Sequence, residues 1–124
     1  MNNIGQNFIN YYYDTMTNQG INKLYDLFDK DVICSVNNNE FIGAYNWLIH
    51  MVKDGIYKFE YNNLSKVVQE IDNSSLIIII NGHLKPIGYW NQFNNNWIPF
   101  IETFILKQNI NNNYFIKNYI IKCN

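Results

Sequence analysis

The sequence predicts a single α+β domain, residues 1–124, in which helices come first and strands follow. Apolar residues recur at helical spacing in the first half of the chain, whereas the second half holds four strand-like segments joined by Asn- and Ser-rich turns. Hairpin-linked strands form an antiparallel sheet, and helices segregated ahead of such a sheet are typical of the α+β class. The chain is 48% hydrophobic, which is enough for one core without disulfides or metals.

Three helices are expected ahead of the sheet. The first covers roughly Ile4–Met16, because apolar side chains recur there every three or four residues, with Gly5 beneath the stripe for close packing. The segment INKLYDLF, 21–28, repeats this spacing over a shorter length, and Gly20 separates it from the first helix. The segment AYNWLIHMVKDG, 44–55, predicts the third helix, with Gly55 as its stop.

A hairpin and four longer strands complete the predicted fold. DVICSV and EFIG pair across the turn 37–39, and the later strands cover roughly 57–71, 76–85, 100–108 and 114–123, the first of them bent near 62–63. The run LIIII at 76–80 does not alternate with polar residues, which indicates a sheet buried on both faces. A second copy of the chain is the simplest cover for the face that the helices leave open. We therefore expect a homodimer, with its interface at Ile78, Ile80 and Phe104.

Charge and cysteine content exclude other function classes. The formal net charge is -1 and all nine basic residues are lysines, so no arginine offers bidentate contacts to phosphate or guanine, and direct nucleic-acid binding is not expected. Cys34 and Cys123 lie far apart without metal-ligand spacing, which favours buried reduced thiols. The polar N-terminus and the short apolar run at 76–80 predict neither a secretory signal nor a membrane span.

Six motifs, in order along nearly the whole chain, resemble the nuclear transport factor 2 family. IGQNFINYYY resembles the family's helix opening, LYDLF its second helix, and EFIGAYNWLIHM its F-x-G turn and following helix. INGHLK, FIETFILK and YFIKNYIIK resemble its V-x-G-x-L strand, its F-x-Q-x-F-x-L strand and its closing strand. The resemblance implies a cystatin-like cone, in which a strongly curved, mainly antiparallel sheet wraps around the long first helix and dimerises through its outer face.

The resemblance reaches two branches of the family with different partners. The transport factor carries the GDP form of the Ran GTPase through acidic residues at the cavity mouth, and it holds Phe-Gly nucleoporin repeats with a tryptophan ahead of the first helix. Here the acid of the hairpin is replaced by Asn37, the segment 86–97 contains no acid, and the tryptophan position falls near Met1. Binding of Ran-GDP is therefore not expected, and a transport factor with a diverged Ran and nucleoporin surface is an alternative.

The second branch, the amino-terminal domain of Ras-GAP-binding stress-granule proteins, binds short Phe-rich peptides between the first helix, the second helix and the last strand. This resemblance implies a non-catalytic dimeric adaptor for FGDF- or FxFG-like peptides, located in the cytoplasm or also in the nucleus or at the nuclear envelope. Consecutive helix residues cannot all face one core, so Tyr12 is expected inward, Tyr13 against the sheet and Tyr11 beside a groove. The implied peptide-binding residues are Ile4, Phe8, Tyr11, Leu24 and Tyr114.

Two further features are candidate sites. The loop GYWNQFNNNW carries Tyr89, Trp90, Phe93 and Trp97, which would form a secondary contact site if exposed; the alternative is that they plug the open end of the cone or serve the dimer. Enzymes of this fold place a histidine and a carboxylate inside the cone, which makes a cavity enzyme or small-molecule binder the other alternative. No spacing singles out a catalytic set, so no catalytic residue, cofactor or metal is expected. The candidate residues for such a set are His50 and His83, with Asp14, Asp31 or Tyr45 as partner.

Overall fold

The computed structural model describes residues 2–89 and 96–124 and confirms the predicted α+β class. Helix α1 (Asn2–Asn18) comes first, followed by the 3₁₀ helix η1 (Ile21–Leu27) and the hairpin strands β1 (Phe28–Val36) and β2 (Asn39–Ile42). Helix α2 (Ala44–Val52) and the short 3₁₀ helix η2 (Lys53–Gly55) lead into the long strands. These are β3 (Ile56–Asp72), β4 (Ser75–Gly88), β5 (Ile98–Gln108) and β6 (Tyr114–Cys123).

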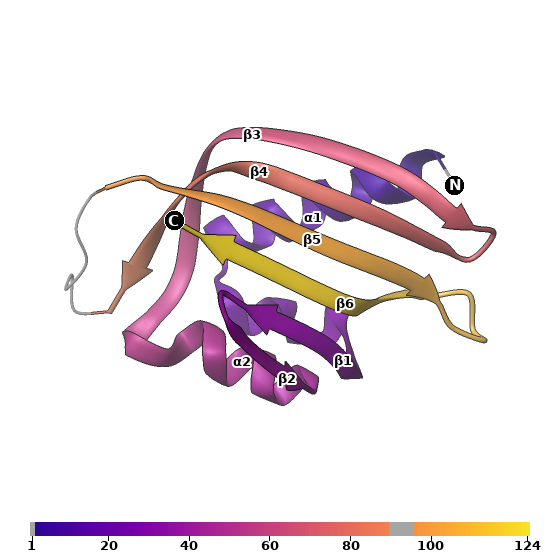
Figure 1. Ribbon diagram of the computed structural model, residues 1–124, viewed down its shortest axis with the longest axis horizontal. Coiled ribbons are helices and arrows are strands. Elements are labelled where there is room, and N and C mark those ends of the chain that lie inside the picture. Colours follow the sequence, from indigo (N-terminus) through magenta and orange to yellow (C-terminus); the bar gives the residue numbers. More distant parts are fainter. Residues whose placement is uncertain (1, 90–95) are drawn as a thin grey trace.

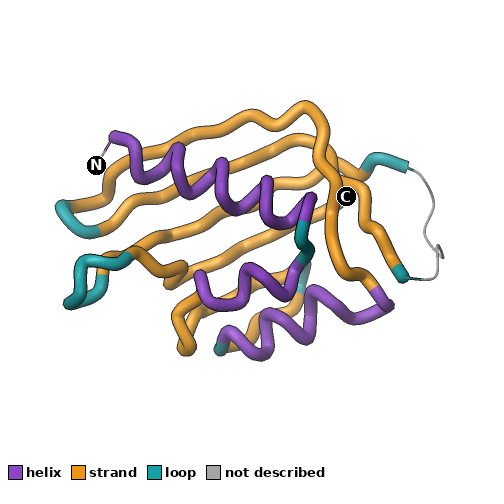
Figure 2. The backbone as a smooth tube through the Cα atoms, turned by 180° about the vertical axis from the view of Figure 1, so that it is seen from behind, coloured by secondary structure: helices purple, strands orange, loops and turns teal. Residues whose placement is uncertain are grey.

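The strands form one curved sheet in the order β2-β1-β6-β5-β4-β3. Neighbouring strands pair antiparallel except β1 and β6, which are parallel. Helix α1 crosses the concave inner face behind the long strands, while η1 and α2 lie at the β1–β2 end (Figures 1 and 2). None of the helices in the described part of the chain is long and apolar enough to cross a membrane.

The sheet bends where the sequence predicts a bend in β3. Asn63 has a left-handed φ of 56°, and the pairing of β3 with β4 shifts between Asn62 and Ser65. Gly82 lies beside this bulge on β4, where a Cβ atom would stand 2.9 Å from the backbone oxygen of Asn63. A β-bulge increases the local twist of a strand, and glycine lets the second strand follow closely. The sheet can therefore curl around α1.

Helix α1 fills the curve with its tyrosine stripe. Tyr12 is wholly buried, and its ring lies 4.8 Å from the ring of Phe104 on the inner face of the sheet. Tyr13 is also buried and meets the ring of Tyr61 at 4.7 Å, whereas Tyr11 remains 53% exposed. These positions confirm that Tyr12 faces the core and Tyr13 the sheet, and they leave Tyr11 at the surface. Gly5 is buried as predicted, and a Cβ atom there would lie 2.6 Å from a methyl group of Val68.

Two predicted helices need correction at their ends. The segment 21–28 forms a 3₁₀ helix that stops at Leu27, because Phe28 already belongs to β1 and stacks on Trp47 with ring centroids 3.9 Å apart. The segment 44–55 is α-helical only to Val52. Asp54 then adopts a left-handed φ of 68°, which breaks the helical path before β3 begins.

The residues predicted for the dimer interface face the wrong way. Ile78, Ile80 and Phe104 are each no more than 1% exposed, and they belong to the core beneath α1. That prediction is wrong, because successive strand residues point to opposite faces and on β4 and β5 the outward positions are the odd-numbered neighbours. Pairing aligns those neighbours in two rows across the outer face. One row holds Val67, Ile79, Thr103, Ile120, Ser35 and Glu40, and the next holds Gln69, Ile77, Ile105, Asn118, Ile33 and Ile42.

Candidate functional site

The exposed edge of α1 carries three of the residues predicted for peptide binding. Ile4 and Phe8 are half-buried and Tyr11 is more than half exposed. The Phe8 ring rests against Phe104 at 5.0 Å between centroids and against Tyr12 at 5.6 Å. Phe8 is therefore held from beneath by buried rings while part of its surface stays open to solvent.

The opposite side of the predicted groove differs from the prediction. Leu24 is wholly buried; it and Ile21 are the two buried residues of η1. The prediction that Leu24 lines an open groove is therefore wrong. Tyr114, at the start of β6, is half-buried and packs against the edge of the core. Four of the five residues predicted for peptide binding therefore lie at least partly at the surface, and the fifth, Leu24, lies in the core.

The aromatic loop is described only at its two ends. Tyr89 is 64% exposed and its ring lies 4.6 Å from the ring of Tyr57. Trp97 is 40% exposed, with the Lys85 ammonium 4.8 Å from its ring centre. Trp90 and Phe93 lie outside the described residues. The two described aromatics therefore pair with neighbours on β3 and β4 and keep an exposed surface.

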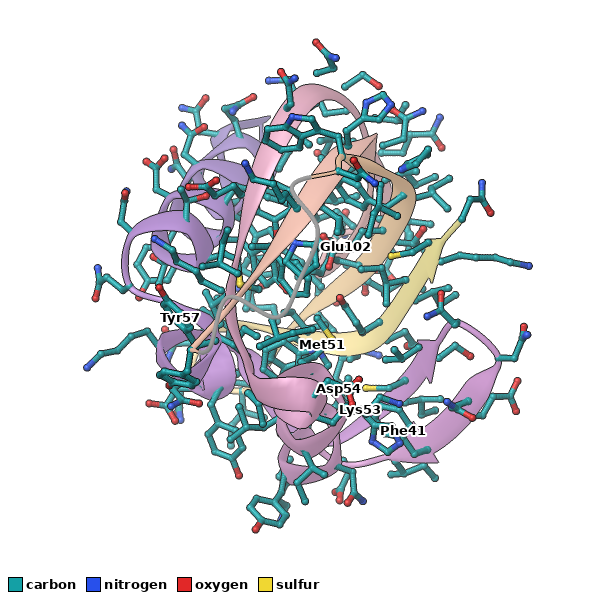
Figure 3. All side chains as sticks on the ribbon, turned by 90° about the vertical axis from the view of Figure 1, so that its left-hand side faces the viewer. Phe41, Met51, Lys53, Asp54, Tyr57 and Glu102 are labelled. Carbon is teal, nitrogen blue, oxygen red and sulfur yellow. The ribbon has the colours of Figure 1, made fainter. Side chains whose placement is uncertain are left out.

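A cavity of about 210 Å³ opens at the end of the cone where α2 meets the strands. Its walls are largely apolar, and polar side chains from α2, η2 and the β1–β2 turn stand among them. Figure 3 looks at this end and shows Met51, Lys53 and Asp54 below Glu102. The lining residues are Val36, Asn37, His50, Met51, Lys53, Asp54, Ile56, Phe59, Leu84, Pro86, Ile98, Ile121 and Cys123.

The polar groups around the cavity are partly engaged within the chain. The side-chain oxygen of Asn37 accepts a 2.9 Å hydrogen bond from the backbone N–H of Cys123. The ring of His50 stacks on Phe41 with centroids 3.9 Å apart, and its Nδ1 lies 2.8 Å from the backbone oxygen of Asn46. Burial, reinforced by the charge of Glu102, raises the pKa of the Cys123 thiol to about 11. The thiol is therefore a poor nucleophile at neutral pH.

A buried carboxyl group in the interior of the cone was not predicted from the sequence. Glu102 on β5 is 1% exposed, and its carboxylate accepts a 2.6 Å hydrogen bond from the Tyr13 hydroxyl and a second one from the Tyr119 hydroxyl. Figure 3 shows Glu102 in the interior of the cone. The signal was present in FIETFILK, where the strand period places the glutamate at an inward position between Phe100 and Phe104.

Burial controls the ionisation of this carboxyl group. Removal from water raises the pKa of Glu102 to about 7, and the hydrogen bonds from Tyr119 and Tyr13 oppose that shift. Burial likewise raises the pKa values of Tyr12, Tyr13, Tyr61 and Tyr119, and the nearby Glu102 charge adds to each of these shifts.

Glu102 does not line the cavity at the open end. Strand pairing places Phe100 opposite Cys123, which lines the cavity. Glu102 is the next inward-facing residue of β5; it pairs with Ile121 and lies further from the open end. The rings of Tyr61 and Phe100 stand 5.7 Å apart near this position, and Phe100 is almost fully buried. A ligand in the cavity would therefore meet apolar walls and the Cys123 thiol before it met the carboxylate.

The structure does not bring the candidate catalytic residues together. His83 is half-buried on β4 next to Leu84, and since Leu84 lines the cavity, His83 faces the other side of the sheet. Asp14, Asp31 and Tyr45 are exposed. Among the described residues no group of three or more His, Cys, Asp or Glu side chains could hold a metal ion.

Comparison with known proteins gives a family and a fold. The family described as "Nuclear transport factor 2 (NTF2) domain" matches residues 4–123. No curated protein matches significantly. Nuclear transport factor 2 from Cryptosporidium parvum superposes with a TM-score of 0.80 at 19% identity, covering 99% of this chain and 94% of that one.

Two enzyme-related structures share the same fold. A candidate ketosteroid isomerase from Parabacteroides distasonis has a TM-score of 0.69 at 15% identity, covering 98% of this chain and 89% of that one. A hexachlorocyclohexane dehydrochlorinase, LinA-type3, from Novosphingobium barchaimii has a TM-score of 0.67 at 12% identity, covering 91% and 81%. At these identities the likeness concerns the fold alone, and the fold serves proteins of both kinds.

Proposed function

The chain belongs to the nuclear transport factor 2 family, and from that premise we propose that it is a non-catalytic, dimeric adaptor that binds short Phe-containing peptides along the exposed edge of α1. The observation that carries this proposal is the Phe8–Tyr11 edge. Phe8 is fixed from below by Phe104 and Tyr12, and Tyr11 stands 53% exposed one turn further on. A rigid aromatic edge binds a partner ring with little loss of side-chain entropy.

The peptide-binding surface is proposed to consist of Ile4, Phe8, Tyr11 and Tyr114, without Leu24. A phenylalanine ring of an extended peptide would pack against Phe8 in an offset or edge-on geometry, which aromatic pairs prefer. Such a short ligand buries little surface, so the expected dissociation constant is on the order of micromolar to tens of micromolar.

A dimer through the outer face of the sheet is part of the same proposal. Seven of the twelve residues in the two outward rows are isoleucine or valine, and Val67, Ile33, Ile42 and Ile120 are 49–62% exposed in the single chain. The helices of the described chain lie on the other face (Figure 1). A sheet face with this many exposed isoleucine and valine side chains is typical of a protein–protein interface, and a stable interface buries on the order of 1,600 Å².

Binding of Ran-GDP is not part of the proposal. Asn37, which stands where the transport factor has an acid, is neutral, and its side-chain oxygen is engaged by the Cys123 N–H. A basic residue of a GTPase would find no carboxylate at this position, and a charge left unpaired in an interface weakens binding by several kcal/mol, roughly 2–5.

Titration with a Phe-Gly-Asp-Phe peptide and a Phe-x-Phe-Gly peptide tests the proposal. Tyr11→Ala should weaken binding roughly tenfold or more, because the exposed ring would be a direct contact. Tyr45→Ala is the matched control, since Tyr45 is 65% exposed on α2, away from the proposed surface. Equal affinity of the two variants and the wild type would place the peptide elsewhere, and no binding at millimolar peptide would refute the adaptor function.

The cavity at the open end favours a second candidate function, the binding of a small apolar molecule. Its volume of about 210 Å³ and its apolar walls suit a compact aromatic ligand. A titration with naphthalene, followed by NMR, tests this candidate. Binding should shift the signals of Met51, Ile56 and Ile98, and Ile98→Trp should abolish those shifts by filling the space. Naphthalene that leaves these signals unmoved at saturation would rule the candidate out.

A further inference from the structure

Glu102 connects three separate elements inside the cone. Its carboxylate accepts hydrogen bonds from Tyr13 of α1 and Tyr119 of β6, while its own backbone belongs to β5. These two bonds span 89 and 17 positions of the chain. The group thus ties the helix to two neighbouring strands at a site that is closed to solvent.

Among the described residues, the titratable groups around Glu102 are phenols and thiols, and none of them is a basic side chain. The titratable groups that act on the cluster are Tyr12 and Tyr13 from α1, Tyr61 from β3, and Tyr119 and Cys123 from β6; Cys34 of β1 acts on Tyr12. From β4 the paired residue is Ile80, which is apolar. The two salt bridges of the described chain belong to other acids, Glu60 with Lys85 and Asp29 with Lys117. An ionised Glu102 is therefore not neutralised by a cation there.

The phenols can hydrogen-bond to either form of the carboxyl group. A hydroxyl group both donates and accepts, so it can donate to a carboxylate or accept the hydrogen of a carboxylic acid. Within the described part of the chain the buried hydroxyl of Tyr12 has no hydrogen-bond partner of acceptable geometry, and it is a third phenol close to Glu102. Glu102 can therefore gain or lose its proton without disruption of the core. Only the ionised form buries a charge, and burying a charge is costly.

We propose that Glu102 is a proton-controlled link between α1 and the sheet, which holds the helix firmly when the carboxyl is protonated and weakens when it ionises. This inference is independent of the peptide function, since it concerns how α1 is attached rather than what it binds. Ionisation leaves a charge in an aromatic core, and the two hydrogen bonds from the phenols offset only part of the free-energy cost of removing that charge from water.

The direction of the pH dependence follows from linkage. Burial raises the folded-state pKa of Glu102 to about 7 from its ordinary 4.5. A raised carboxyl pKa means that the contribution to folding is fully present below the unfolded value and is lost as the pH rises toward and through 7. From pH 5 to pH 8 the folding equilibrium constant should fall by roughly 50- to 100-fold through this group alone.

Urea denaturation of the intact protein at pH 5, 6, 7 and 8 tests the link, with Glu102→Gln as the matched variant. Glutamine keeps the size and the hydrogen-bonding capacity but cannot ionise, and comparison with it cancels all other titrating groups. The wild type should lose stability relative to Glu102→Gln as the pH rises. Parallel pH profiles of the two proteins would overturn the proposal.

Carbon-13 NMR of the carboxyl group in the wild type gives a second readout that does not depend on how the variant folds. The Glu102 carboxyl should titrate near pH 7, and the ring signals of Tyr13 and Tyr119 should shift with the same midpoint. A Glu102 carboxyl that titrates near its ordinary value of 4.5 would overturn the proposal even if Glu102→Gln failed to fold.

Discussion

The hydroxyl of Tyr13 on α1 donates a 2.6 Å hydrogen bond to the carboxylate of Glu102 on β5, 89 residues further along the chain. This contact fixes the middle tyrosines of α1 against the sheet and leaves Tyr11 at the surface. It thereby defines which edge of the helix a partner can reach.

Removing that hydroxyl should destabilise the fold in a pH-dependent way. Tyr13→Phe keeps the ring that packs on Tyr61 but takes a donor from Glu102. Ionisation strengthens this one bond to about 1.5–3 kcal/mol, although that gain offsets only part of the cost of burying the charge. The free energy of unfolding should therefore fall by up to that amount at pH 8 and by less at pH 5. Denaturant titration measures both values. Tyr11→Phe, at an exposed position of the same helix, should leave stability unchanged; an equal loss in both variants would contradict the assigned role of Tyr13.

The bend of the sheet should depend on Gly82. In Gly82→Ala the new methyl group would stand 2.9 and 3.0 Å from the backbone oxygens of Asn63 and Asn62. Backbone must shift to relieve these contacts, and overpacking of this kind reduces stability by about 1–3 kcal/mol. Lys107→Ala, at an exposed position of β5, serves as the control. A Gly82→Ala variant with the wild-type denaturation midpoint would show that the strands do not meet as closely as described.

The outer face of the sheet should hold the dimer together. A lysine at Ile79, in the centre of one outward row, would put a charge into the proposed apolar interface. Sedimentation should give the wild type twice the chain mass of 14.8 kDa and Ile79→Lys a single chain mass. Ile110→Lys tests the same chemistry at a position that is 97% exposed in the β5–β6 turn, and it should remain dimeric. A monomeric wild type at micromolar concentration would refute the dimer.

Much of the fold could be predicted from residue spacing, because α1, the bend of β3 and the inward position of Tyr12 follow from local patterns. The interface prediction failed at Ile78 and Ile80 because isoleucine also occupies 77 and 79, so the composition of the run does not show which face is inward. Leu24 was misplaced because the resemblance gave a position but not its exposure.

Glu102 was missed for a different reason. The strand period places Glu102 at an inward position, but an acid is usually exposed, and only the partners from α1 and β6 explain how the carboxyl group is accommodated there. Those partners lie 89 and 17 residues away, so no local pattern points to them. The parallel pairing of β1 with β6 is long-range in the same sense.

The most direct test of the proposed function is a residue-resolved NMR titration of the labelled protein with a Phe-Gly-Asp-Phe peptide. Our account predicts saturating shifts at Ile4, Phe8 and Tyr11, with a dissociation constant on the order of micromolar to tens of micromolar. The signals of Met51 and Ile98, at the cavity, should stay in place. Shifts confined to Met51 and Ile98, or no shifts at millimolar peptide, would contradict the claim that the edge of α1 is the binding surface.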